Sequence, residues 1–114
     1  MNNKIETYIG FSIRSGKIIF GVEMLERQKK GVYLLIADGA IGKNSLKSMV
    51  NAQAKFGCPF LMTDEGVLSA TVHRPAVKAV AITAQNLAKA ILSVADSEPQ
   101  IKFYSGGNIC TYGK

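Results

Sequence analysis

The sequence predicts an α/β fold, namely a three-layer α-β-α sandwich around a small four-stranded mixed sheet. Apolar runs of strand length alternate with segments of helical periodicity, and glycines stand at many of the junctions. One run, residues 32–37, is apolar throughout. A strand of that kind is covered on both faces, as in a sheet held between two helical layers.

The individual elements follow from apolar spacing, capping residues and glycine stops. Ile5, Tyr8, Ile9 and Ile13 recur at the spacing of an amphipathic helix and predict one over residues 3–14. The remaining elements are expected, in order, as a strand over 17–20, a helix from 21 to 30, a strand over 32–37, a helix capped by Asn44 or Ser45 and ended by Gly57, a strand over 59–62, a short helix from Thr63 or Asp64 through Leu68, a strand over 77–82 and a helix over 84–95.

The chain of 114 residues is expected to form one domain over residues 1–95, followed by an extension over 96–114. Residues 97–100 read as a linker. The segments 101–104 and 109–112 flank the turn-forming stretch 105–108. Two alternatives stay open for this extension: a small hairpin, or a mobile tail.

Composition narrows the class of protein. The net charge of +6 favours a polyanionic partner. Cys58 and Cys110 lie far apart without metal-site spacing, so a reduced, cytoplasmic setting without metal is expected. The start lacks the pattern of a secretory leader, and no apolar run reaches the length of a membrane span, so no membrane partner is expected.

Catalytic chemistry finds little support in the residues. His73 is the single histidine and reads as a surface loop residue. The segment 39–45 resembles a phosphate-binding loop, but its glycines are too close together, so it reads as a turn and helix cap from which Lys43 reaches at most a phosphate. We therefore expect no enzyme, no catalytic residue, no cofactor and no small-molecule substrate.

Basic residues gather near the predicted second helix. Five of the fourteen Lys and Arg residues fall between Arg14 and Lys30. Gly21, at the expected helix start, lacks a Cβ and so allows close approach of another backbone. This combination is typical of contact with a nucleic-acid backbone.

The order of elements resembles the kink-turn RNA-binding family of ribosomal proteins and their small bacterial relatives. The resemblance covers roughly residues 4–94 and is carried by short motifs: Ser15-Gly-Lys-Ile-Ile-Phe-Gly21, Lys30-Gly-Val-Tyr-Leu-Leu-Ile-Ala-Asp38, Asn44-Ser45, Phe56-Gly-Cys-Pro59, Leu68-Ser-Ala-Thr-Val72, Val80-Ala-Ile82 and Leu87-Ala-Lys-Ala-Ile91. It implies the α-β-α sandwich and RNA binding without a cofactor.

The resemblance also implies a set of RNA-binding residues. The first turn of the second helix would enter the groove of a bent RNA, and a short apolar loop would cover an extruded base. The implied residues are Gly21, Glu23, Met24, Arg27, Leu68, Ser69 and Ala70. Beside them, the cations Arg14, Lys17 and Lys30 are expected to hold phosphates. Met24 stands where the family often has Glu or Gln, and Ser69 and His73 each replace a glycine.

The resulting hypothesis is a non-catalytic, cytoplasmic RNA-binding protein that recognises structured, kink-turn-like RNA, ribosomal or other, through backbone and shape. The ribosome is its expected setting. The alternative is a protein-interaction module on the same fold, in which Met24 and the Leu68 loop form an apolar patch.

Overall fold

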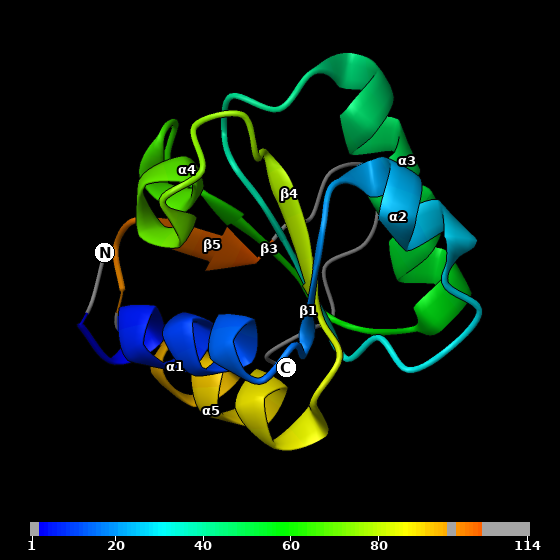
Figure 1. Ribbon diagram of the computed structural model, residues 1–114. Coiled ribbons are helices and arrows are strands. Elements are labelled where there is room, and N and C mark those ends of the chain that lie inside the picture. Colours follow the sequence, from blue (N-terminus) through cyan, green and yellow to red (C-terminus); the bar gives the residue numbers. More distant parts are fainter. Residues whose placement is uncertain (1–2, 96–97, 104–114) are drawn as a thin grey trace.

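Five short strands form one mixed sheet, and helices lie on both of its faces (Figure 1). The computed structural model describes residues 3–95 and 98–103. Its elements, in chain order, are α1 (Asn3–Arg14), β1 (Ile18–Phe20), α2 (Val22–Arg27), β2 (Leu34–Ala37), α3 (Lys43–Phe56), β3 (Phe60–Thr63), α4 (Val67–Val72), β4 (Ala79–Ile82), α5 (Gln85–Ala95) and β5 (Ile101–Phe103). The predicted mixed α/β class is confirmed.

The strands lie in the order β1-β4-β2-β3-β5. β2 and β3 run parallel, whereas the other neighbouring pairs are antiparallel. The central strands β2 and β4 are buried along their whole length and face each other through pairs such as Ile36 and Val80. Among the described strands, β1 and β5 form the two edges of the sheet.

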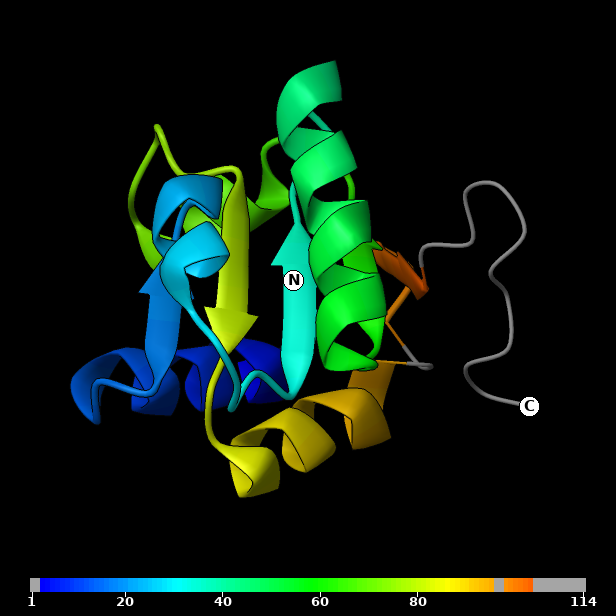
Figure 2. The ribbon, with the colours of Figure 1, turned by 90° about the vertical axis from the view of Figure 1, so that its right-hand side faces the viewer.

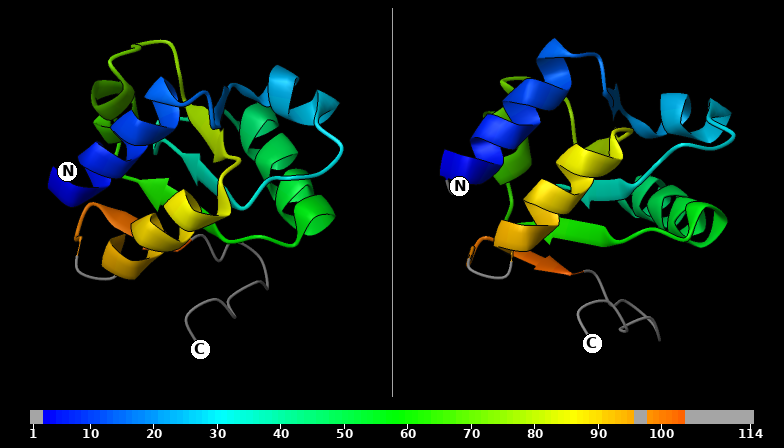
Figure 3. Two further views of the ribbon diagram at one scale, coloured as in Figure 1. Left: turned by 60° about the horizontal axis from the view of Figure 1, so that its bottom comes forward. Right: turned by 90° about the horizontal axis from the view of Figure 1, so that it is seen from below.

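Successive side chains of a strand point to opposite faces, so the sheet supplies two hydrophobic clusters. Leu34 and Ile36 of β2 pack with α1, α4 and α5. Leu35 and Ala37 pack on the other face with α2 and α3 (Figures 1 and 2). On the first face, α1 and α5 also pack against each other (Figure 3).

The predicted number of four strands is wrong, because β5 adds a fifth. Thr63 and Leu61 of β3 pair with Ile101 and Phe103 of β5. This pairing covers the edge of β3 and buries Ile101, which retains 6% of its exposure. Packing of the described residues thus continues past the expected boundary at residue 95. The turn and second arm of the expected hairpin, residues 104–112, lie outside the described residues.

Asp38 explains why α4 begins later than expected. Its buried carboxylate accepts hydrogen bonds from the backbone N–H groups of Gly66, Leu68 and Ser69, at 2.8, 3.0 and 3.3 Å. These groups belong to the start of α4, so a residue at the end of β2 caps it. The prediction of a start at Thr63 or Asp64 is wrong, because Thr63 belongs to β3.

The starts and ends of two other helices also differ from expectation. Gly42 precedes α3 without a side-chain cap, so the expected caps Asn44 and Ser45 lie inside the helix. α2 ends at Arg27, because Gln28 is extended and donates its N–H to Leu25. Across the described residues, no helix combines the length and apolarity needed to cross a membrane.

Candidate nucleic-acid interface

The start of α2 and the loop between α4 and β4 lie next to each other at one end of the sheet. Gly21 donates its backbone N–H to the carbonyl of Ala79, the first residue of β4, at 2.9 Å. This N–H is therefore already used within the protein and is not available to RNA. Gly21 has a φ of 85°, and no atom within 4 Å would meet an added Cβ. The surface beside Gly21 is open.

The first turn of α2 presents exposed side chains beside this glycine. Leu25 faces the core with 3% of its surface exposed. Glu23, Met24 and Arg27 are exposed, and Met24 retains 54% of its surface. No side chain caps this helix start. Glu23, Met24 and Arg27 are thus all accessible on α2, which begins directly after Gly21.

Two cations that the sequence reasoning missed lie beside this surface. The guanidinium of Arg74 lies 4.3 Å from the ring centroid of Phe20, the last residue of β1. The ammonium of Lys78 donates to Ser69 Oγ and to the carbonyl of Pro75, each at 3.3 Å. The sequence could have indicated Arg74 as a candidate, because it directly follows His73 in the loop that leads to β4. Both cations add positive charge near Gly21.

The predicted apolar loop takes a different place. Leu68 is fully buried in the core, so its side chain offers no surface to a base. Ser69 keeps 8% of its exposure and donates its hydroxyl to the carbonyl of Val77 at 2.8 Å. Only Ala70 of the three is exposed. The proposed contact through Leu68 is wrong for this structure, because α4 turns that residue inward.

The buried carboxylate of Asp38 holds this end of the sheet together. Burial raises its pKa, but hydrogen bonds from the N–H groups of Ala40, Gly66, Ser69 and Leu68 outweigh burial and keep the pKa below its usual range. The carboxylate joins the ends of β2 and β3 to α4. Through Ser69 and Lys78, that support extends to the start of β4.

The other predicted cations of this segment lie at the opposite end of β1. Lys17 immediately precedes β1, and its carbonyl accepts the N–H of Thr83 after β4. Gly21 immediately follows β1, so the two ends are separated by roughly 13 Å at about 3.3 Å per residue. The guanidinium of Arg14 lies over the ring of Phe11, 4.9 Å from its centroid. Cations therefore lie at both ends of the edge strand.

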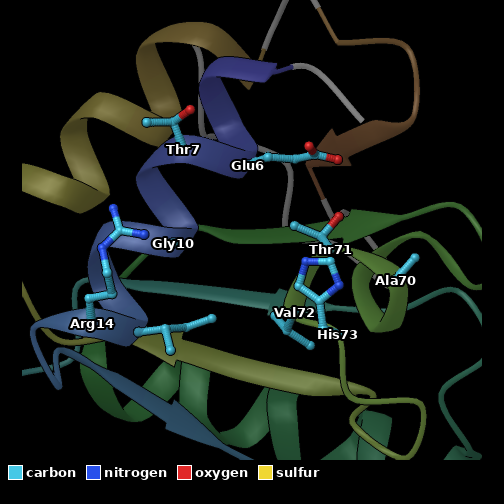
Figure 4. Close-up of a pocket in the computed structure, with 9 residues that line it drawn as sticks. Glu6, Thr7, Gly10, Arg14, Ala70, Thr71, Val72 and His73 are labelled. Atoms are coloured by element: carbon cyan, nitrogen blue, oxygen red, sulfur yellow. The ribbon is translucent and has the colours of Figure 1, made fainter.

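A cavity of about 510 Å³ lies between α1 and α4 (Figure 4). It is lined by Arg14 and Glu6 from α1 and by Ala70 and His73 from α4 and its end. His73 has a φ of 58°, in the left-handed region that a non-glycine residue rarely adopts. Arg14 and Ala70 therefore lie around the same cavity. Arg14 lines it from α1, and His73 lines it from the end of α4.

Lys29 and Lys30 are separated from this group. They follow α2 and line a different cavity with Lys55, near the carboxyl end of α3. The basic segment that looked continuous in the sequence is thus divided between two surfaces. Lys30, predicted to act with Gly21, instead belongs to the second.

The turn that resembled a phosphate-binding loop has a packing role at its first glycine. A Cβ on Gly39 would lie 2.8 Å from the carbonyl oxygen of Thr63 and 2.9 Å from the N of Glu65. Gly39 is therefore needed for the close approach of two backbone segments. Lys43 is exposed at the start of α3.

Two further observations concern reactive groups. Burial raises the pKa of the Cys58 thiol to about 11, so it stays protonated at neutral pH. Among the residues that the structure describes, no group of three or more His, Cys, Asp or Glu side chains could hold a metal ion.

No protein-family model matches the chain, and no curated protein matches it. The fold is similar to the solved structure of a protein with unknown function from Bacillus halodurans C, with a TM-score of 0.68. The two chains are 13% identical over 83% of this chain and 99% of the other. At that identity, the likeness shows a shared fold and carries no statement about activity.

Proposed function

We propose that this chain is a non-catalytic, cytoplasmic RNA-binding protein that recognises bent, kink-turn-like RNA along the edge formed by β1. The observation that carries the proposal is the placement of cations at both ends of this strand. Lys17 directly precedes the strand, Arg14 is the last residue of α1 before it, and the Arg74 guanidinium lies over Phe20, its last residue. Helices on both sheet faces also fit the three-layer sandwich that the family resemblance implies.

The chemistry of this edge suits a phosphate backbone. A single RNA strand presents one negative charge per nucleotide, and Arg binds phosphate through a planar fork of donors. The open surface at Gly21 admits a close backbone approach, while Arg74 is held in place by the Phe20 ring. Successive phosphates of one RNA strand span the roughly 13 Å between the two ends of β1, and the preference for bent RNA follows from the family resemblance.

Binding should depend on salt in proportion to the phosphates contacted. Four or five contacts give a slope of log K against log salt of about −3 to −4. The direct test compares a kink-turn RNA with a straight duplex of the same length and composition, by fluorescence anisotropy. We expect tighter binding to the kink-turn RNA. Equal, salt-sensitive binding to both would leave only general attraction to a polyanion.

Met24 supports a second candidate, a protein-interaction module on the same fold. It is 54% exposed and lies at the proposed RNA contact, where a thioether is a poor hydrogen-bond partner. The substitution Met24→Glu distinguishes the two candidates. Under RNA recognition, a carboxylate that accepts from a guanine edge should tighten kink-turn binding roughly tenfold, from about 1.5 kcal/mol for a charged hydrogen bond. Under the alternative, capture of a protein partner in nuclease-treated extract should fall.

A further inference from the structure

A cavity of about 360 Å³ lies where the chain leaves α2 and passes the carboxyl end of α3. Three lysines line it, and no Asp or Glu does: Lys29, Lys30, Lys55. We refer to it as the lysine pocket. Figure 1 shows the two segments next to each other, on the α2–α3 side of the sheet. Such an arrangement costs electrostatic repulsion unless an anion is present.

Hydrogen bonds from and to Gln28 organise the loop that carries two of these lysines. The side-chain amide of Gln28 donates to the carbonyl of Lys30 at 3.1 Å. The carbonyl of Gln28 in turn accepts from the ammonium of Lys55 at 2.6 Å. Lys55 is thus fixed against the loop, and its ammonium also lies 5.1 Å from the ring centroid of Phe56. The Lys55 ammonium and the backbone of the loop are therefore held in place before any ligand arrives.

An aromatic ring completes the lining. Tyr33 is 39% exposed, and its backbone N–H is fixed by the carbonyl of Ile82 at 2.9 Å. An exposed ring beside ammonium groups is the combination that single-stranded nucleic acid uses, because bases stack on the ring and phosphates meet the cations. The carboxyl end of α3 opposes an anion with only about half a charge, against three full positive charges.

We propose that the lysine pocket is a second RNA contact, which holds a single-stranded segment with its phosphates on the lysines and one base stacked on Tyr33. This inference deepens the proposed RNA-binding function and rests on it. The β1 edge takes the bent, structured part of the RNA. The pocket takes a strand that extends from it.

Three RNA probes test the proposal by fluorescence anisotropy at 0.1 M salt. They are a kink-turn RNA with blunt ends, the same RNA with a single-stranded extension of about ten nucleotides, and the extension alone. Ten nucleotides span at least about 34 Å at the stacked rise of 3.4 Å. That length exceeds the greatest extent of the protein, 30 Å. An extension that follows the protein surface therefore covers a path at least as long as the greatest extent of the molecule.

The variant with Lys29→Gln and Lys30→Gln removes two charges and leaves the bond between Lys55 and Gln28 intact. Its matched control, Lys47→Gln with Lys89→Gln, removes two exposed lysines from α3 and α5. Each lost single-strand contact should weaken binding about fivefold at this salt, so the pocket variant should bind the isolated extension roughly 25-fold more weakly. The control should change by less than about twofold, and blunt kink-turn binding should stay within about twofold in both.

Substitution of Tyr33 separates stacking from charge. Tyr33→Phe should keep binding of the extension, whereas Tyr33→Leu should weaken it roughly 5- to 100-fold. The pocket is refuted if its lysine variant and the control lose the same affinity for the extension, or if the extension adds equal affinity in both. If wild-type protein fails to prefer the blunt kink-turn RNA over a duplex, the proposed function fails instead, and the isolated extension still decides the pocket.

Discussion

The starts of α2 and α4 lie at the same end of the sheet, yet only the start of α4 is capped by a side chain. Asp38 reaches α4 from the end of β2 and accepts hydrogen bonds at its start. α2 begins after Gly21, which offers no side-chain cap. The start of α4 is thus capped by a side chain, whereas the start of α2 has no side-chain cap, and Gly21 donates its N–H to the carbonyl of Ala79. A helix start can serve a ligand only where the chain has not already supplied the acceptor.

Removing the acceptor at α4 should give the largest effect. In Asp38→Asn, an amide replaces one carboxylate oxygen and leaves the N–H groups of Leu68 and Ser69 without an acceptor. The free energy of unfolding should fall by about 2–4 kcal/mol, as expected for two buried unpaired donors. Urea denaturation measures this loss. Asp64→Asn, at an exposed position, should change stability by less than about 0.5 kcal/mol.

The variant Gly39→Ala tests how tightly the backbone packs at the same end of the sheet. Gly39→Ala would place a Cβ 2.8 Å from the backbone oxygen of Thr63, and neither backbone segment can move freely. We expect a loss of about 1–3 kcal/mol, the usual cost of overpacking. Gly42→Ala is the matched control in the same turn, since nothing lies within 4 Å of its added Cβ. An equal loss in both variants would contradict the packing role of Gly39.

The pH dependence of stability should sharpen the role of Asp38. Its pKa is lower in the folded chain than the usual value of an aspartate, so the unfolded chain binds the proton more readily. The contribution of Asp38 is therefore present above the unfolded pKa of about 3.9, and it is lost as pH falls through the folded pKa. Stability curves of wild type and Asp38→Asn should converge below about pH 4. A constant difference down to pH 2 would refute this assignment.

The smallest expected effect concerns Arg74, which lies beside the uncapped start of α2. Arg74→Ala should weaken binding of kink-turn RNA roughly five- to eightfold at 0.1 M salt, with a salt slope shallower by about 0.7 to 0.9. The loss should be general for phosphate and leave thermal stability nearly unchanged. Lys89→Ala, on the exposed surface of α5, serves as control. If both variants lose equal affinity, the RNA does not follow the β1 edge.

Local patterns were sufficient where the physical cause is local. The spacing of Ile5, Ile9 and Ile13 predicted a helix over residues 3–14, and α1 spans Asn3–Arg14. The apolar run at 32–37 predicted a doubly covered strand, and β2 is buried throughout. Both results follow from side-chain periodicity, which a single segment carries by itself.

Features set by distant partners were missed. Residues 101–104 were expected as one arm of a hairpin or part of a mobile tail, whereas Ile101 and Phe103 pair with β3, and nothing within the segment indicates that partner. Leu68 was expected at the surface, but Asp38 shifts the start of α4 and turns this residue inward. The cations near Lys30 were grouped with Gly21 by sequence distance, whereas the end of α2 at Arg27 carries them to α3.

The edge strand β1 has β4 as its partner, and Ile18 pairs with Ile82. During synthesis of the polypeptide, β1 therefore cannot pair until β4, about 60 residues later in the chain, has been made. At about 5–20 residues per second, the delay is roughly 3–13 s. The surface proposed to meet RNA therefore forms only after β4 has been synthesised.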